Sequence, residues 1–418
     1  MIETMSSSDH RNWAGNLTYG ATRVERPRSV AELQAVVSRE SSVKALGSRH
    51  SFSAVADTTG VHVSVADLPE VVEVDTAASR VRVSAGMRYA ELAERLDSAG
   101  LALSNLASLP HISVGGAVAT GTHGSGDRNG SLARSVAALE LVTADGSLLH
   151  LRRGDSDFDG SVVSLGRLGV VTSLELDVVP TFQVMQSVHE GLGWERLEHD
   201  LDAVMSAAYS VSLFTDWSDA GPSIWVKSVD DEDPDRRFDG ATRATSARHP
   251  IPGADPEWTT SQSGTGAWWD RLPHFRREFT PSAGDELQTE YLVPRSQGLA
   301  AVQAVRGMAD QVRPLLLVSE IRSVAGDDLW LSPSHTTDCL ALHFTWRPDA
   351  DEVLALLPVL DDQLTTFGAR PHWGKLFRTT PERLGVAYPR LADFGALADR
   401  LDPRGIFRNV FTDEALGR

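Results

Sequence analysis

Hydrophobic and polar positions recur with helical and strand periods through the first 180 residues, which predicts a region of mixed helices and strands. Ser29 and Glu32 have the spacing of a capping box, and the helix that they open continues through Leu33 and Val36. A second helix should end at Gly100, because apolar side chains recur before it at i, i+3, i+4 and i+7, namely at Tyr89, Leu92, Ala93 and Leu96.

Strand patterns lie between and after these helices. Residues 71–74 and 81–83 alternate apolar and polar positions, as half-buried strands do. Residues 139–151 give the strongest hairpin signal in the chain, centred on Asp145 and Gly146. Residues 169–179 predict one long strand that ends at Pro180.

The pattern changes after Pro180. Residues 217–266 are polar and rich in Pro, Gly, Asp and Ser, and the acidic run at residues 230–235 indicates a solvated surface loop rather than a metal site. Strands are predicted at residues 290–293, 315–324 and 339–346, and helices at residues 299–312 and 351–364. We therefore expect an α+β protein of two domains, with the last few dozen residues returning to the first.

Composition narrows the class of protein. The chain of 418 residues is long for one core and sufficient for two. Its net charge of −18 argues against nucleic acids and anionic membrane surfaces as partners, because basic patches bind both. Cys339 is the single cysteine, which excludes an intramolecular disulfide, and its apolar surroundings indicate a core position. With no signal-peptide pattern and no run of apolar residues long enough to span a membrane, we expect a cytoplasmic protein.

Two segments could hold an anionic cofactor. In residues 44–52 an apolar strand leads into Gly47 and Ser48, whose small side chains let backbone amides approach an anion, and then into His50. A histidine in such a loop more often forms an ordinary hydrogen bond than reacts. Residues 107–126 contain five glycines among Ser and Thr without a charged residue, which suits a phosphate or pyrophosphate. Neither the phosphate loop of nucleotide hydrolases nor the dinucleotide-binding glycine turn matches this segment.

Polar residues in the later strands are a third candidate. Glu320 and Arg322 lie two residues apart in an apolar strand and hence on one face, and the same holds for His343 and Thr345. Burying a charged side chain in such a strand costs free energy unless the charge is paired, hydrated or needed for function. A structural salt bridge therefore remains an alternative. Residues 372–375 add a histidine and Lys375.

Together these segments resemble the flavoproteins of the vanillyl-alcohol-oxidase type, and most closely the alditol oxidases, which are related to the sugar-lactone oxidases. The resemblance extends from residues 12–15 to residues 402–409. It implies an FAD-binding domain at residues 1–182, a substrate-binding domain built on an antiparallel sheet at residues 183–369, and a C-terminal segment at residues 370–418 that returns to the FAD domain. It also implies that His50 bonds covalently to the flavin.

The resemblance further implies which residues bind the cofactor and the substrate. The expected FAD contacts are Ala45, Leu46, Gly47, Ser48, Arg49, His50, Ser51, Ser108, Ser113, Gly116, Ala117, Val118, Ala119, Thr120, His123, Val171 and Lys375. The expected substrate contacts are Ser108, Glu320, Arg322, His343, Thr345 and Lys375. Asp127 is added to them, because an acid stands there where alditol oxidases carry a small apolar residue, although a surface turn is the alternative.

The implied reaction moves a hydride from the terminal primary alcohol of a small polyol to FAD and then to O2, giving an aldehyde and hydrogen peroxide. Arg322 and Lys375 would stabilise the developing alkoxide, with Glu320 orienting Arg322. No residue is assigned as the general base. Ala107 lies where the family controls oxygen access to the flavin, and alanine leaves the choice between oxidase and dehydrogenase open. The rival functions are a sugar-1,4-lactone oxidase or dehydrogenase and a non-catalytic flavin-binding protein. We expect a monomer without a metal.

Overall fold

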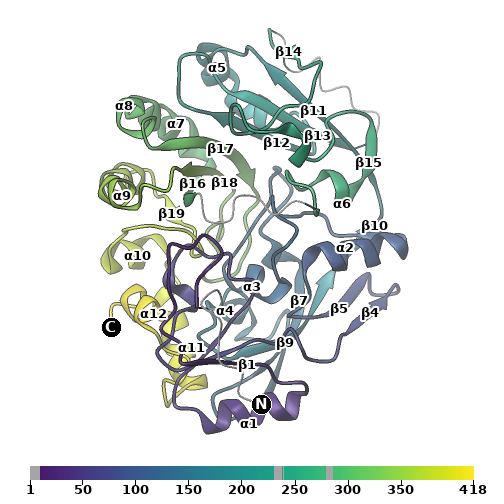
Figure 1. Cartoon of the computed structure of the whole chain (residues 1–418), viewed down its shortest axis with the longest axis vertical. Helices are drawn as coiled ribbons and strands as arrows, with labels where there is room; N and C mark the ends of the chain where they lie inside the picture. The colour runs from purple at the N-terminus through teal and green to yellow at the C-terminus, as the bar shows by residue number, and fades with distance from the viewer. Residues whose placement is uncertain (1–9, 230–237, 239, 279–285) are drawn as a thin grey trace.

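The computed structural model describes residues 10–229, 238, 240–278 and 286–418, so the acidic run at residues 230–235 lies outside the described residues. Figure 1 shows the N-terminal elements and the C-terminal helices together in one part of the molecule and the strands that follow Pro180 in the other. None of the helices within those ranges has the length and apolar character that crossing a bilayer requires.

The N-terminal part contains three sheets. Its strands are β1 (Arg23–Glu25), β2 (Val43–Ala45), β3 (Val61–Val63), β4 (Val72–Asp75), β5 (Arg80–Ser84), β6 (Leu101–Ala102), β7 (Val136–Val142), β8 (Leu148–Arg152), β9 (Val170–Asp177) and β10 (Val179–Pro180). Its helices are α1 (Val30–Arg39), α2 (Tyr89–Ser98), α3 (Val114–Ala119) and α4 (Phe158–Ser161). The order β1-β3-β2 makes a parallel sheet, β4-β5-β9-β7-β8 an antiparallel one, and β10 pairs with β6.

The local predictions for this part are confirmed with two differences. The Ser29 hydroxyl accepts from the Glu32 amide at 3.1 Å, but the Glu32 carboxylate accepts from the Arg28 amide, so the capping box is shifted by one residue. Helix α2 ends before Gly100, and β7 and β8 form the predicted hairpin. The strand predicted at residues 169–179 breaks after Asp177, because β10 leaves that sheet to pair with β6.

The second part is built on one nine-stranded sheet. Its strands are β11 (Gln183–Glu190), β12 (Ser210–Thr215), β13 (Ser223–Val229), β14 (Thr242–Arg243), β15 (Thr265–Ala267), β16 (Leu287–Pro294), β17 (Leu316–Val324), β18 (Cys339–Trp346) and β19 (Arg370–Pro371). Its helices are α5 (Trp194–Met205), α6 (Trp268–Arg271), α7 (Gly298–Gly307), α8 (Ala309–Val312) and α9 (Ala350–Thr365). The order is β14-β11-β13-β12-β17-β18-β16-β19, β15 also pairs with β11, and every pairing is antiparallel.

The sequence pattern found β16, β17, β18 and α9 but not β11, β12 or β13. Strand β12 is buried throughout although Ser210 and Ser212 interrupt its apolar residues, and β13 carries the buried Lys227. Buried polar residues in these strands interrupt the pattern of apolar positions from which strands are predicted. The helix predicted at residues 299–312 is two helices, since Met308 leaves the helical conformation between α7 and α8.

The two faces of this sheet differ in character. Helices α7 and α9 contact β16, and α7 also contacts β18, over an apolar core that includes Tyr291, Leu342 and Phe344. Side chains alternate between faces along a strand, so the residues between these positions point to the opposite face. There Glu290, His343 and Glu320 are direct cross-strand partners.

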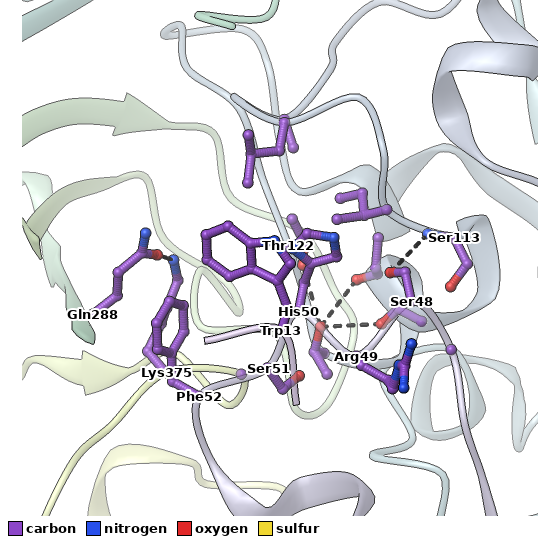
Figure 2. A pocket seen from close by; sticks show the side chains of 18 of the residues that line it. Trp13, Ser48, Arg49, His50, Ser51, Phe52, Ser113, Thr122, Gln288 and Lys375 are labelled. Atoms are coloured by element: carbon purple, nitrogen blue, oxygen red, sulfur yellow. Dashed lines mark hydrogen bonds between the residues drawn. The ribbon is translucent and has the colours of Figure 1, made fainter. Parts of the chain in front are cut away.

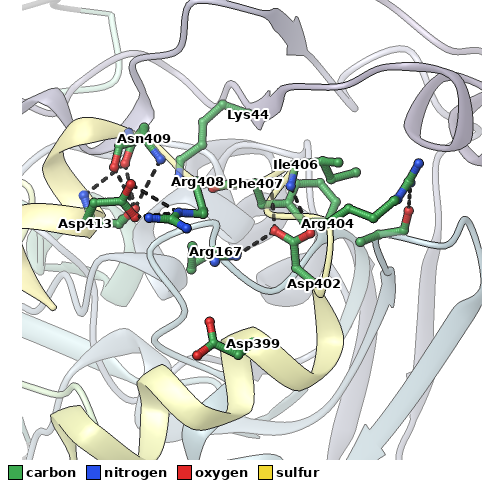
Figure 3. A network of polar contacts seen from close by, with 12 residues as sticks. Lys44, Arg167, Asp399, Asp402, Arg404, Ile406, Phe407, Arg408, Asn409 and Asp413 are labelled. Carbon is green, nitrogen blue, oxygen red and sulfur yellow. Dashed lines mark hydrogen bonds and ion pairs between the residues drawn. The ribbon is translucent and has the colours of Figure 1, made fainter. Parts of the chain in front are cut away.

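The C-terminal helices return to the N-terminal part, as Figure 1 shows. These are α10 (Pro381–Ala387), α11 (Leu391–Leu401), which contacts α4, and α12 (Val410–Ala415). Arg167 and Asp402 form a buried ion pair at 2.6 Å, which ties this segment to the loop before β9 (Figure 3). The Asn409 amide donates to the carbonyl oxygens of residues 54, 55 and 57, which fixes the chain beside the loop that contains His50.

Candidate active site

A cavity of about 430 Å³ lies between the two parts of the molecule and takes side chains from both. Its N-terminal wall is formed by the loop after β2, by the glycine-rich segment around α3 and by residues before β9. Its other wall is the polar face of β16, β17 and β18, together with residues 372–375 after β19. The cavity therefore brings together all three groups of residues that the sequence singled out.

His50 lies in the N-terminal wall with its ring stacked on Trp13 at 5.1 Å between centroids (Figure 2). Its Nδ1 atom is buried and has no hydrogen-bond partner. Burial, with smaller contributions from His111, Arg88, Lys375 and Arg49, lowers the pKa of His50 to about 4, so the imidazole is neutral at neutral pH. A neutral, orphaned ring nitrogen in a cavity is available as a nucleophile.

The two glycine-containing segments lie against each other. A side chain at Gly47 or at Gly116 would place its Cβ only 2.7 or 2.8 Å from the Ser113 hydroxyl oxygen, so neither position tolerates one without a shift. The Ser113 amide donates to the Ser48 hydroxyl at 3.2 Å (Figure 2), while the Ser113 hydroxyl is buried without a partner. This close approach leaves polar atoms beside the cavity that can receive an anionic group.

These features fit a flavin cofactor. The cavity lining includes the predicted FAD contacts apart from Val118, which lies on the far side of α3 in the apolar core. The lining members are Ala45, Leu46, Gly47, Ser48, Arg49, His50, Ser51, Ser108, Ser113, Gly116, Ala117, Ala119, Thr120, His123, Val171 and Lys375. Val118 does not line the cavity, because in a helix its side chain points in another direction than those of Ala117 and Ala119, and its contact with FAD remains a prediction.

A connected set of charges covers the sheet wall. Arg322 Nη2 donates to Glu290 Oε1 at 2.6 Å, Arg322 Nε lies 3.6 Å from Glu320 Oε2, and Arg322 Nη1 donates to the Ser108 hydroxyl at 3.3 Å. The side chains of Glu290, Glu320 and Arg322 are each less than a tenth exposed. Despite this burial, the guanidinium holds the pKa of Glu290 well below its usual range.

Lys375 approaches the same region from residues 372–375. Its ammonium donates to the Gln288 side-chain oxygen and lies 5.4 Å from the centre of the Phe52 ring (Figure 2). Burial lowers the pKa of Lys375 to about 8, which Glu290 opposes and Arg322 reinforces. Two cations, Arg322 and Lys375, thus line one wall, where the carboxylates of Glu286, Glu290 and Glu320 balance their charge.

His343 and Thr345 complete this wall from β18. His343 Nε2 lies 3.2 Å from the Thr345 hydroxyl, and His343 Nδ1 lies 3.5 Å from Glu290 Oε2. The structure therefore brings six predicted substrate contacts to the cavity, namely Ser108, Glu320, Arg322, His343, Thr345 and Lys375. Their contact with a substrate remains a prediction.

Asp127 does not reach the cavity. Its carboxylate pairs with Arg295 at 2.9 Å and accepts from the Ser206 hydroxyl, with 31% of the side chain exposed. The prediction that it contacts the substrate is wrong, because β-bridge pairing of Gly126 with Val324 turns the next residue toward α5 and Arg295.

Sequence reasoning missed several polar residues of the site. Glu290 and Gln288 line the cavity from β16, and His274 Nε2 lies 2.9 Å from Glu320 Oε1. Glu290 begins the run at residues 290–293 that was predicted as a strand. The rule that singled out Glu320, a charge in an apolar strand, applies equally to Glu290 and would have found it.

One buried group has the composition of a metal site. Ligand atoms of His123, Glu290 and His372 lie within 4.8 Å of one another. Two contacts argue against a cation there. Arg322 already neutralises Glu290, and His372 Nδ1 accepts from the Gly374 amide at 3.1 Å, which leaves the ring proton on Nε2, the nitrogen that a metal would need.

Comparisons with known proteins agree with this geometry. Residues 21–152 match the family described as FAD binding domain, and residues 285–415 match the family of D-arabinono-1,4-lactone oxidase. The chain is 51% identical to an alditol oxidase of a Streptomyces species, over 97% of this chain and 98% of that protein. It is 31% identical to an L-gulono-1,4-lactone dehydrogenase of Mycobacterium tuberculosis, over 97% of this chain and 98% of that protein.

Solved structures share the fold at much lower identity. A cholesterol oxidase from B. sterolicum has a TM-score of 0.80 at 14% identity, with 100% of this chain and 99% of that chain covered. A chitooligosaccharide oxidase has a TM-score of 0.76 at 15% identity, with 98% and 96% covered. The predicted α+β fold of the vanillyl-alcohol-oxidase type, with its antiparallel sheet, is confirmed.

Proposed function

The chain belongs to the alditol oxidase family of FAD-dependent oxidoreductases, and from that membership we propose that it oxidises the terminal primary alcohol of a small polyol, such as xylitol, sorbitol or a glycerol-like alcohol. The products are the aldehyde and, from O2, hydrogen peroxide. The observation that carries the substrate class is the polar sheet wall, where Arg322, Glu320 and Thr345 offer donors and acceptors to successive hydroxyl groups.

The chain's own residues bind the polyol and stabilise the reacting oxygen. The hydroxyls of Ser108 and Thr345 bind neighbouring substrate hydroxyls. Arg322 and Lys375 meet the oxygen that loses its proton, and each such donor stabilises a developing oxyanion by about 3 kcal/mol. Glu320, 3.6 Å from the Arg322 guanidinium, keeps that group in the cavity wall. A pure flavin carrier has no use for this set of paired charges.

FAD, when bound, supplies the hydride acceptor and returns the electrons to O2. We propose that residues 1–182 hold it, with its pyrophosphate at the segments around Ser48 and Ser113 and its ring bonded covalently to His50. The neutral and unpartnered Nδ1 atom of His50 supports this attachment. Residues 183–369 would bind the substrate, and residues 370–418 would support the FAD domain. Since one chain supplies both walls of the cavity, we also propose that it acts as a monomer.

A peroxide assay with several substrate classes tests the proposed function. Purified holoenzyme is supplied in turn with xylitol, sorbitol, glycerol, L-gulono-1,4-lactone and a 2-hydroxy acid, and kcat/KM is measured for each. The proposal predicts the highest value with a polyol. A higher kcat/KM with the lactone would assign the protein to the lactone-oxidising branch instead.

A further inference from the structure

The alcohol's hydroxyl proton needs an acceptor, and several histidines line the cavity where the proposed function places the reaction. A histidine can act as a base only if one ring nitrogen is free to accept a proton and points toward the substrate. The hydrogen bonds of each ring decide which nitrogen that is. The partners of the two ring nitrogens therefore determine which histidine qualifies.

His372 and His123 do not meet this requirement. His372 Nδ1 already accepts from the Gly374 amide at 3.1 Å, so its other nitrogen carries the proton. His123 Nδ1 donates to the Gly124 carbonyl oxygen at 2.9 Å, and its Nε2 lies 3.3 Å from Glu290 Oε1. The free nitrogen of His123 is directed at a carboxylate and not at the substrate contacts.

His274 and His249 are excluded as well. His274 Nε2 donates to Glu320 Oε1 at 2.9 Å, which leaves Nδ1 to accept, but that atom is buried with no predicted substrate contact within hydrogen-bond distance, and Phe214 and Trp225 pack edge-on against the ring at 5.2 and 5.8 Å. His249 Nδ1 accepts from the Ile251 amide at 3.0 Å. His50 has its own role at the flavin.

His343 has the required arrangement. Glu290 Oε2 lies 3.5 Å from His343 Nδ1 without a hydrogen bond between them, and the electrostatic attraction of the carboxylate favours the ring proton on that atom. The other nitrogen, Nε2, lies 3.2 Å from the Thr345 hydroxyl and is thus an acceptor beside a predicted substrate contact. Because Glu290 and His343 are direct cross-strand partners in β16 and β18, the sheet itself sets this geometry.

We propose that His343 is the base that removes the hydroxyl proton of the substrate, and that Glu290 is the positioning residue that makes this possible. The O–H bond breaks and its proton passes to His343 Nε2, while the C–H hydride leaves to the flavin, so the alcohol becomes an aldehyde. The imidazolium so formed keeps its Nδ1 proton against the Glu290 carboxylate. That proton is lost to solvent before the next turnover.

The surrounding charges suit this role. Lys375 and Arg322 face His343 and disfavour its charged form, whereas Glu290 and Glu320 favour it. Burial and the two cations lower the pKa of His343, which keeps the ring neutral and ready to accept a proton at neutral pH. Glu290 also holds Arg322 at 2.6 Å, so one carboxylate orients both the base and a cation that meets the reacting oxygen.

His343→Ala tests the base directly. With xylitol and the FAD-loaded enzyme, kcat should fall by about 100-fold or more while flavin content stays unchanged. Added imidazole should restore part of the activity, and the restored rate should follow the concentration of the neutral imidazole as pH is varied. A structural role of His343 would give no such rescue.

Glu290→Gln tests the positioning role, since the amide keeps the shape and an acceptor oxygen but removes the charge. Without the anion the imidazolium is less stable, so the acid limb of the kcat/KM profile should move to lower pH and kcat should fall. Thr289→Val is the matched control. It changes the same strand on the opposite face, where it removes only the bond from Trp346 Nε1 at 3.1 Å, and should leave the profile unchanged.

The outcomes separate this proposal from the proposed function. One contrary outcome is that wild type oxidises xylitol while His343→Ala keeps its kcat, or while Glu290→Gln leaves the acid limb of the kcat/KM profile at the same pH. Either result overturns the proposed roles of His343 and Glu290 and leaves the oxidase function standing. If wild type oxidises no polyol, the proposed function fails. Nitrogen-15 NMR of the histidines in the holoenzyme then still tests the pairing of His343 with Glu290, because that pairing requires the ring proton of His343 on Nδ1.

Discussion

Single side chains in this cavity have protonation states set by burial more than by their own chemistry. His50 is neutral because it is enclosed, and Lys375 has its pKa lowered to about 8 for the same reason. Glu290 and Glu320 remain ionised in equally dry surroundings because Arg322 lies between them. The cavity thus combines a neutral imidazole with cations and carboxylates that remain charged despite their burial.

His50→Ala should abolish covalent flavin attachment, because it removes the unpartnered imidazole that supports the bond. Wild-type protein that is precipitated with acid and washed should stay yellow and release a fluorescent peptide containing His50, whereas the variant should lose its flavin to the supernatant. His150→Ala, which removes an exposed ring on β8, is the control and should behave like wild type. Wild-type protein that loses all its flavin on washing would contradict the covalent bond.

Arg322→Ala and Lys375→Ala should each lower kcat by about 100-fold or more with little loss of flavin, because each removes a cation from the developing alkoxide. Steady-state kinetics with xylitol and the ratio of flavin to protein absorbance give both quantities. Arg295→Ala is the matched control, since this arginine is paired with Asp127 outside the cavity. A variant at 322 or 375 with normal kcat would show that the reacting oxygen lies elsewhere.

Helices and strands were predicted correctly where the residues that define them are close together in the sequence. Helix α1 and the β7–β8 hairpin carry their own start and turn signals at Ser29 and Gly146, and both were predicted. Strands β12 and β13 were missed because buried Ser212 and Lys227 interrupt their apolar pattern, although the two strands are neighbours in sequence and pair with each other. The prediction for Asp127 failed because its partner Arg295 lies 168 residues later in the chain.

The C-terminal segment should contribute strongly to stability through Asp402. This carboxylate is fully buried, pairs with Arg167 at 2.6 Å, and accepts from the amides of Ile406 and Phe407 at 2.9 Å each (Figure 3). Asp402→Ala leaves a buried guanidinium uncompensated, which typically costs about 3–5 kcal/mol. We expect a clear drop in Tm and in the midpoint of urea unfolding.

The matched control is Asp399→Ala in α11, whose carboxylate pairs with Arg418 and is 56% exposed. Exposed pairs contribute about 1 kcal/mol or less. If both variants unfold at the same urea concentration, the buried pair does not hold this segment to the FAD-binding part.

The whole molecule places the part that matches an FAD-binding domain and the polar face of the nine-stranded sheet on opposite sides of one cavity. The sequence resemblance predicted the family and the fold, and the alditol oxidase relative and the solved structures confirm both. Sequence alone could not show that Glu290, His123 and His343 meet, because they come from three separate segments that only the assembled fold joins. The residue types in the sequence indicated which groups the site contains, and the fold shows which of them are in contact.

The most direct test of the account is the colour of the flavin. Purified holoenzyme is mixed with xylitol under argon, and the absorbance of the oxidised flavin is followed before and after air is admitted. A polyol oxidase should bleach without oxygen, and on aeration it should regain its colour while hydrogen peroxide forms. Flavin that stays oxidised with xylitol and every other polyol supplied in excess would contradict the central claim.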